Sequence, residues 1–255
     1  MTVDTTIIQI LEDFFLRFGI KYNNHDKVTL WLIRYFNFRL KYIVLNQREV
    51  KVSKGLTEKI STHPNCNVLS DIFNKAAQGD DLNPYQSKAS FNADYHDLLF
   101  NDWGIHHLHL RSDKENPSDY FNGRTGLLLF VKFTIDTAYF LDIKSHDDWS
   151  NTDFIRIIQR NWPEIIADRE IPNTQWSPNF NDEKIGILRK KGYLFGINVD
   201  EKAYLILGHG RTSSGDNAMA IRLANEVWRW VGENKHLFDT NLDTFKLGLN
   251  EQLHI

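Results

Sequence analysis

Apolar residues recur at helical spacing in the first part of the chain. Apolar positions three and four residues apart predict a helix over residues 6–18 and a second helix from residue 26 to about residue 45. A short strand over 49–54 and a short helix over 67–77 follow. Residues 78–92 are polar and loop-like, so we place a domain boundary at their end. The pattern therefore predicts a helical N-terminal region, residues 1–92.

Beyond this boundary the apolar residues alternate with polar ones, which is typical of strands. The predicted strands cover residues 105–110, 126–135 and 137–146, and a helix follows over 150–161. A second hairpin is predicted over 192–207 and a strong helix over 218–231. We therefore predict an α+β fold with a helical N-terminal part, a central antiparallel sheet module, and a C-terminal β-hairpin and helix. The last two parts form the region 93–255.

Composition and charge narrow the class of protein. The 255 residues are 42% hydrophobic and 25% charged, which is typical of a globular protein and not of a disordered one. The net charge of -3 argues against a globally basic nucleic-acid binder, although it allows a local basic groove.

Cysteine usage and apolar runs bear on location. The single cysteine, Cys66, cannot form an internal disulfide, which favours a reducing compartment. The longest apolar run, residues 127–133, is too short for a membrane span and contains Lys132. The first four residues show no basic segment of a signal peptide. We expect a cytoplasmic protein with no membrane partner.

The most unusual segment is rich in histidine. Residues 103–110 read Trp-Gly-Ile-His-His-Leu-His-Leu, with three histidines in four positions. In a strand, Leu108 and Leu110 would face the core, while His107 and His109 would project together from the other face. We expect that face to be exposed and to carry chemistry. The alternative is a surface strand whose histidines are merely solvated.

A second polar row follows along the chain. Asp142, Lys144 and His146 alternate with apolar residues, so one strand face would present an acid, a cation and an imidazole. Histidine titrates near neutral pH and suits proton transfer, and a nearby lysine could stabilise a phosphorane-like charge. The alternative is a surface salt bridge between Asp142 and Lys144, with His146 capping a turn.

The order of these elements resembles a known family. A histidine-bearing strand, an apolar strand and a strand ending in Ser-His-Asp are similar to the RelE/YafQ-type toxins, small endoribonucleases that cut messenger RNA. The matching stretches here are residues 107–110, 126–131 and 142–147, within 103–149. Many such toxins have an acid just before the apolar strand, where this chain has Arg124-Thr125-Gly126.

The resemblance implies a function and a set of site residues. It implies attack of a 2′-OH on the adjacent phosphate without a metal or other cofactor, in an endoribonuclease of toxin or phage-defence type. Either His107 or His109 matches the early histidine of the family, and His146 matches the late one. The expected partners are RNA and an antitoxin or other protein. The predicted catalytic set is His107, His109, His146, Asp142 and Lys144.

Contacts with the substrate can also be predicted. Lys144 and Arg124 would contact phosphate, and Trp103 or Trp149 would stack on a base. Two other functions stay open. The three histidines His107, His109 and His146 could hold a divalent metal in a metal-dependent hydrolase. Alternatively, the histidine face could recognise a nucleic acid or a protein without catalysis.

The loop at residues 208–217 is the second candidate site. It follows a strand and opens a helix, and its glycines, its hydroxyl groups and Arg211 suit a phosphate at a helix N-terminus. We expect Arg211 to lie in an exposed loop, and Ser213 to help hold an anion. No Walker-type Gly-Lys-Ser/Thr is present. The alternative is a simple helix cap made by Asp216 or Ser214.

Overall fold

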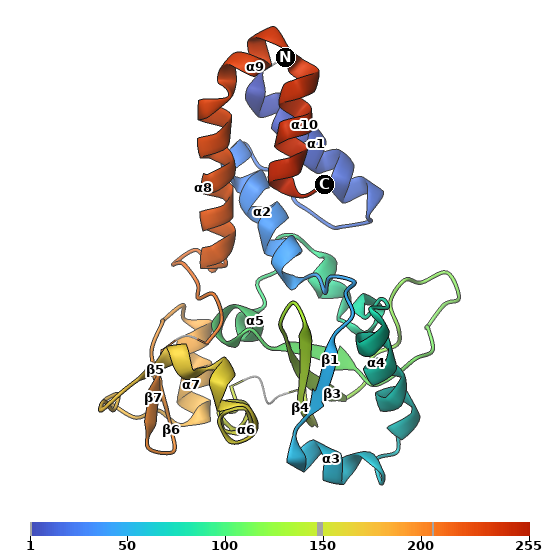
Figure 1. Ribbon diagram of the computed structural model, residues 1–255, viewed down its shortest axis with the longest axis vertical. Coiled ribbons are helices and arrows are strands. Elements are labelled where there is room, and N and C mark those ends of the chain that lie inside the picture. The colour runs from blue at the N-terminus through green and yellow to red at the C-terminus, as the bar shows by residue number, and fades with distance from the viewer. Residues whose placement is uncertain (1, 147–149, 206) are drawn as a thin grey trace. The chain divides into compact units, whose positions relative to one another are not determined.

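The computed structural model describes residues 2–146, 150–205 and 207–255 (Figure 1). This part of the chain forms two compact units, and each unit is assembled from separate segments. The helical unit comprises Met1–Leu40, Phe91–His96 and Asp216–Ile255, and the sheet unit comprises Lys41–Ser90 and Asp97–Gly215. The predicted α+β class is confirmed. The predicted boundary after residue 92 falls within a segment of the helical unit, because the N-terminal and C-terminal helices belong to one unit.

The helical unit is held together by aromatic side chains. Ring contacts join Phe14 to Tyr35 at 5.1 Å between centroids and Trp230 to Phe245 at 5.4 Å. Thr2 caps the first helix, because its side chain accepts a hydrogen bond from Thr5 N. The helices predicted over 6–18, 26–45 and 218–231 are present. The described helices of this unit are α1 (Val3–Arg17), α2 (Val28–Lys41), α8 (Ala218–Glu233), α9 (Lys235–Thr240) and α10 (Leu242–Leu253).

The larger sheet of the other unit has the strand order β1-β4-β3-β2 in the described residues. Its strands are β1 (Glu49–Val52), β2 (His106–His109), β3 (Leu127–Phe133) and β4 (Thr137–Ser145). The last three pair antiparallel, as predicted, but β1 pairs with β4 in parallel. The sheet is therefore mixed rather than antiparallel, because a strand from the first part of the chain completes it.

Helices cover both faces of this sheet. On one face, α3 (Lys54–Ile60) and α4 (Cys66–Gln78) share a core with Leu108, Leu129 and Phe140. On the other face, α5 (Leu98–Trp103) and α6 (Asp153–Asn161) share a core with Leu128 and Phe130. The alternation of side chains along each strand divides its apolar residues between these two cores.

A smaller sheet carries the predicted second hairpin. Its strands β5 (Glu170–Ile171), β6 (Ile197–Val199) and β7 (Lys202–Tyr204) have the order β5-β7-β6. The neighbouring α7 (Asp182–Lys190) buries Ile185 in the core that also contains Ile197 and Tyr204. Short 3-10 helices complete the described secondary structure at Asn83–Tyr85, Lys88–Phe91, Pro163–Ile165 and Ala167–Arg169.

Among the helices in the described part of the chain, none combines the length and the apolar character that crossing a bilayer requires.

Candidate active site

The histidine-rich segment lies at the edge of the larger sheet, directly after α5. The side chain of Asp97 caps α5 by accepting from Phe100 N at 3.0 Å. Gly104 ends the helix in the left-handed conformation, with φ at 67°, which glycine adopts without a steric penalty. The chain then turns into β2, which places His106 at the first position of an edge strand.

The predicted alternation of β2 is confirmed. Leu108 and Leu110 belong to the core under α3 and α4, so His107 and His109 face the opposite side of the sheet. In the register of β2 and β3, His107 pairs with Phe130 and His109 pairs with Leu128. Residues paired across strands share a face, so the two histidines lie on the α6 side of the sheet.

The polar row of β4 lies on this same face. Phe130 pairs with Asp142, and Leu128 pairs with Lys144. The register shifts between Phe130 and Val131, which leaves Leu141 as the extra residue of a β-bulge. The two polar rows are thus separated by one strand, which places their backbones about 10 Å apart.

Burial contradicts the expectation of an open histidine face. His107 is 5% exposed and His109 is 3% exposed. The α6 helix covers the sheet here by packing Phe154 on Phe130, with 4.4 Å between ring centroids. His107 and His109 therefore offer little surface to a macromolecular substrate.

His109 is held as a neutral hydrogen-bond donor. Its Nδ1 accepts from Thr125 N at 3.1 Å, so this nitrogen carries no proton. Burial lowers the pKa of His109 to about 4, and the charges of His107, Arg124 and His146 act in the same direction. At neutral pH its proton therefore lies on Nε2, which can donate but cannot act as a base.

His107 has a different environment. Its Nδ1 lies 3.7 Å from Asp97 Oδ2, at the N-terminus of α5. Burial lowers the pKa of His107, while the carboxylate of Asp97 opposes that effect. His107 and Asp97 therefore form a buried pair between β2 and the N-terminus of α5.

His146 is the exposed member of the group. It follows β4 directly, and its backbone N donates to Gly126 O at 3.2 Å. Gly126 is adjacent to Thr125, which contacts His109. The electrostatic effect of His146 on the pKa of His109 also indicates that the two imidazoles are neighbours. Arg124, which is exposed, lies close enough to lower the pKa of His109 too.

Asp142 and Lys144 are tied into ion pairs. Lys59 Nζ from α3 donates to Asp142 Oδ1 at 2.7 Å, and Asp142 is 7% exposed. Lys144 Nζ lies 3.9 Å from Asp142 Oδ2 and 3.6 Å from Asp153 Oδ2. The alternative of an ion pair between Asp142 and Lys144 is therefore present, and Lys144 is already bound between two carboxylates.

Of the two predicted stacking tryptophans, the structure describes Trp103. Trp103 is 4% exposed, and the guanidinium of Arg189 lies over its ring at 4.2 Å from the centroid. The prediction that Trp103 stacks on an RNA base is wrong, because α5 turns it into the core. Trp149 lies outside the residues that the structure describes.

The C-terminal loop also differs from its prediction. Arg211 is 4% exposed, and its Nε donates to Asp102 Oδ1 at 2.6 Å, so it is not an exposed anion ligand. Ser213 is exposed. The cap of α8 is Asn217, whose side chain accepts from Met219 N at 2.9 Å, rather than Asp216 or Ser214.

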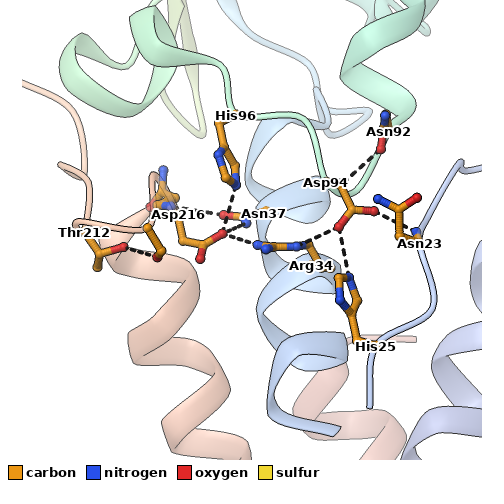
Figure 2. Close-up of polar contacts among 11 residues, drawn as sticks. Asn23, His25, Arg34, Asn37, Asn92, Asp94, His96, Thr212 and Asp216 are labelled. Carbon is orange, nitrogen blue, oxygen red and sulfur yellow. Dashed lines mark hydrogen bonds and ion pairs between the residues drawn. The ribbon is translucent and has the colours of Figure 1, made fainter. Parts of the chain in front are cut away.

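A second polar cluster was not predicted. Figure 2 shows it within the helical unit, with Arg34 at its centre. Arg34 Nε donates to Asp94 Oδ1 at 2.8 Å, and its Nη1 donates to Asp216. His25 Nε2 donates to Asp94 at 2.9 Å, and His96 Nε2 donates to Asp216 at 3.0 Å. The members come from three distant segments, so no local spacing in the sequence indicates the cluster.

The metal alternative needs a cluster of ligand side chains. Within residues 2–146, 150–205 and 207–255, no three or more His, Cys, Asp or Glu side chains form a group that could hold a metal ion. Comparison with known proteins finds no matching family, curated protein or solved structure. The resemblance to RelE/YafQ-type toxins stays a prediction.

The burial of His106 should make the free energy of unfolding depend on pH. Its ring lies between Phe100 and Phe133, at 4.7 and 5.3 Å between centroids, and burial lowers its pKa to about 3. The unfolded chain therefore binds this proton at a higher pH than the folded protein does. The free energy of unfolding should fall as the pH drops from about 6.5 towards 4.

Denaturant unfolding at several pH values tests this expectation. A His106→Leu variant places an apolar side chain between Phe100 and Phe133 and removes the titrating group. Its stability should fall less steeply over the same pH interval. An equally steep fall in the variant would assign the acid sensitivity to other groups.

Proposed function

We propose that this protein is a cytoplasmic endoribonuclease of toxin or phage-defence type, with its active site at His146, His109 and Arg124. The observation that carries the proposal is the meeting of three different groups at one end of the sheet. These groups are an exposed imidazole, a buried neutral imidazole that donates through Nε2, and an exposed guanidinium. RNA cleavage by internal attack needs a proton acceptor and a cation beside the phosphate, and the buried imidazole would position the chain next to that cation.

The chemistry divides among these residues. His146 accepts the proton of a 2′-OH, whose oxygen attacks the adjacent phosphorus. The bond from phosphorus to the 5′ oxygen breaks, and that oxygen takes a proton from water. The products are a 2′,3′-cyclic phosphate and a free 5′-OH. The exposed Arg124 contacts a non-bridging phosphate oxygen and neutralises its charge, while the buried His109 holds Thr125, the residue next to Arg124, in position.

The other predicted catalytic residues have supporting roles in this proposal. Asp142 and Lys144 fix the end of β4 through their ion pairs with Lys59 and Asp153. His107 is a buried neighbour of His109 and does not contact RNA. A protein antitoxin, which the resemblance implies, would inhibit the enzyme by covering His146.

Substitution of His146 provides the decisive experiment. His146→Ala should reduce cleavage of a labelled RNA by about 100- to 10,000-fold, because it removes the proton acceptor. Binding should change little, since Arg124 remains. His236→Ala is the matched control, because His236 is also exposed but lies on α9 of the helical unit. It should cleave like the wild type.

The products and the metal requirement complete this test. The wild type should cleave in EDTA and leave 2′,3′-cyclic phosphate ends, and its expression, but not that of His146→Ala, should stop bacterial growth. Cleavage that stops in chelator and returns with zinc or manganese would favour the metal-dependent hydrolase. RNA that is bound but stays intact would favour the non-catalytic binding protein.

A further inference from the structure

A surface hollow next to α7 has the character of a ligand site. It has a volume of about 450 Å³ and is lined by Asn179, Phe180, Asn181, Glu183, Lys184 and Ile187. This volume falls within the range of roughly 300–1,000 Å³ that is typical of small-molecule sites. Part of the wall is apolar, since Ile187 is 41% exposed.

Local interactions give the hollow a defined shape. Asn181 caps α7 by accepting from Lys184 N at 2.9 Å, which fixes where the helix begins. The ring of Phe180 contacts Phe195 edge to face, with 5.9 Å between centroids. Ile187 lies one turn after Glu183 and Lys184, so these three residues share one face of α7.

The lining residues suit a nucleobase. An aromatic ring and an exposed aliphatic side chain provide apolar walls for a flat ring, and RNA-binding proteins often stack single-stranded bases on such aromatic rings. The carboxylate of Glu183 and the amide of Asn179 provide acceptors at the rim. Such acceptors favour bases with an exocyclic amino group, which are adenine, cytosine and guanine, over uracil. The ammonium of Lys184 suits the attached phosphate.

Hydrogen bonds and an ion pair connect α7, beside the hollow, to the end of β4. Asp182, the first residue of α7, accepts from Thr152 Oγ1 at 2.8 Å and from Thr152 N at 3.1 Å. The next residue, Asp153, pairs with Lys144, which precedes His146 by two positions. These contacts join the beginning of α7 to the end of β4, so the hollow and His146 belong to the same part of the sheet unit.

We propose that the hollow beside α7 binds one amino-bearing base of the RNA, in preference to uracil, a few nucleotides from the cleaved bond. This inference rests on the proposed function, because it assigns a specificity subsite to the same enzyme. Phe180 stacks on the base and Glu183 accepts from its amino group. The site would thus select RNA by sequence at a distance from the reacting phosphate.

Binding of uncleavable RNA tests the subsite separately from the reaction. Fully 2′-O-methylated oligomers of A, C and U lack the attacking hydroxyl, so their affinities are measured without turnover, by fluorescence anisotropy. The A and C oligomers should bind more tightly than the U oligomer. Phe180→Ala should weaken binding of A and C by about tenfold, the size expected for one lost stacking contact.

Two further variants make this test specific. Glu183→Gln should reduce the preference for C over U, because an amide can also donate to the carbonyl of uracil. Phe18→Ala removes another exposed phenylalanine, on the helical unit, and should leave every affinity unchanged. Denaturant unfolding of Phe180→Ala shows whether the variant keeps its fold.

The outcomes separate the two proposals. RNA cleavage by the wild type, together with oligomer affinities that do not depend on Phe180, would overturn the subsite and leave the endoribonuclease intact. The absence of any oligomer binding would also overturn the subsite. Binding that depends on Phe180 and prefers A and C, without any cleavage of unmodified RNA, would overturn the endoribonuclease and support the subsite.

Discussion

Replacing Asp102 with asparagine should lower the free energy of unfolding by ~3–5 kcal/mol, because it leaves two buried arginines without their carboxylate. Asp102 receives Arg211 Nε at 2.6 Å and forms an ion pair with Arg189 Nε at 2.7 Å. Burial lowers the pKa of Arg189, whereas Asp102 and Asp97 act to raise it. Both arginines are less than 5% exposed, so water cannot replace the lost partner.

A double variant tests this explanation by denaturant unfolding. Arg211→Met in the background of Asp102→Asn removes one of the two uncompensated cations and should restore part of the stability. Strictly additive losses would contradict the coupling. By itself, Arg211→Ala should destabilise the protein, whereas the sequence predicted that Arg211 lies in an exposed loop. The difference follows from burial, since Arg211 donates to Asp102 and to the carbonyl of Arg189.

Arg34→Leu should destabilise the helical unit by about 3 kcal/mol, because it removes the cation between two carboxylates. Asp216 is 3% exposed, and Asp94 is 15% exposed by side chain. Without Arg34, both would carry negative charge in poorly solvated positions. The two histidines, His25 and His96, would remain as hydrogen-bond donors to them.

Unfolding by denaturant measures this loss, and Arg229→Leu is its control. Arg229 is an exposed arginine on α8, and its replacement should change the stability by less than about 0.5 kcal/mol. Because the Arg34 cluster is shielded from solvent, the loss should depend little on salt concentration. Equal effects of the two substitutions would mean that the cluster contributes no more than a surface ion pair.

The elements with strong periodicity could be predicted from the sequence. The first helix, the α8 helix and the strands β2, β3 and β4 follow directly from the spacing of their apolar residues. The face of His107 and His109 could also be predicted, because alternation in a strand fixes it. Short helices such as α5 and α7 have too few turns for their periodicity to stand out from chance.

The burial and the partners of the site residues depend on contacts between segments far apart in the sequence. The burial of His107 and His109 results from the helix cover on one face of the sheet, and no pattern within β2 indicates it. The glycine and serine residues around Arg211 indicate a surface position, whereas Asp102, its partner, lies 109 positions away in the sequence. The parallel pairing of β1 with β4 likewise joins distant segments.

The segmented helical unit has a consequence for how the protein is made. The hydroxyl of Tyr35 on α2 donates to the carbonyl of Leu253 on α10, across 218 positions of the chain. Ribosomes add residues from the N-terminus, and domains tend to fold as units during synthesis. The sheet unit, whose last segment ends at Gly215, can be translated in full before α8, α9 and α10 exist. During synthesis, the aromatic side chains of α1 and α2 therefore stay uncovered until α8, α9 and α10 have been made. This makes this stage of biogenesis the one most dependent on chaperones.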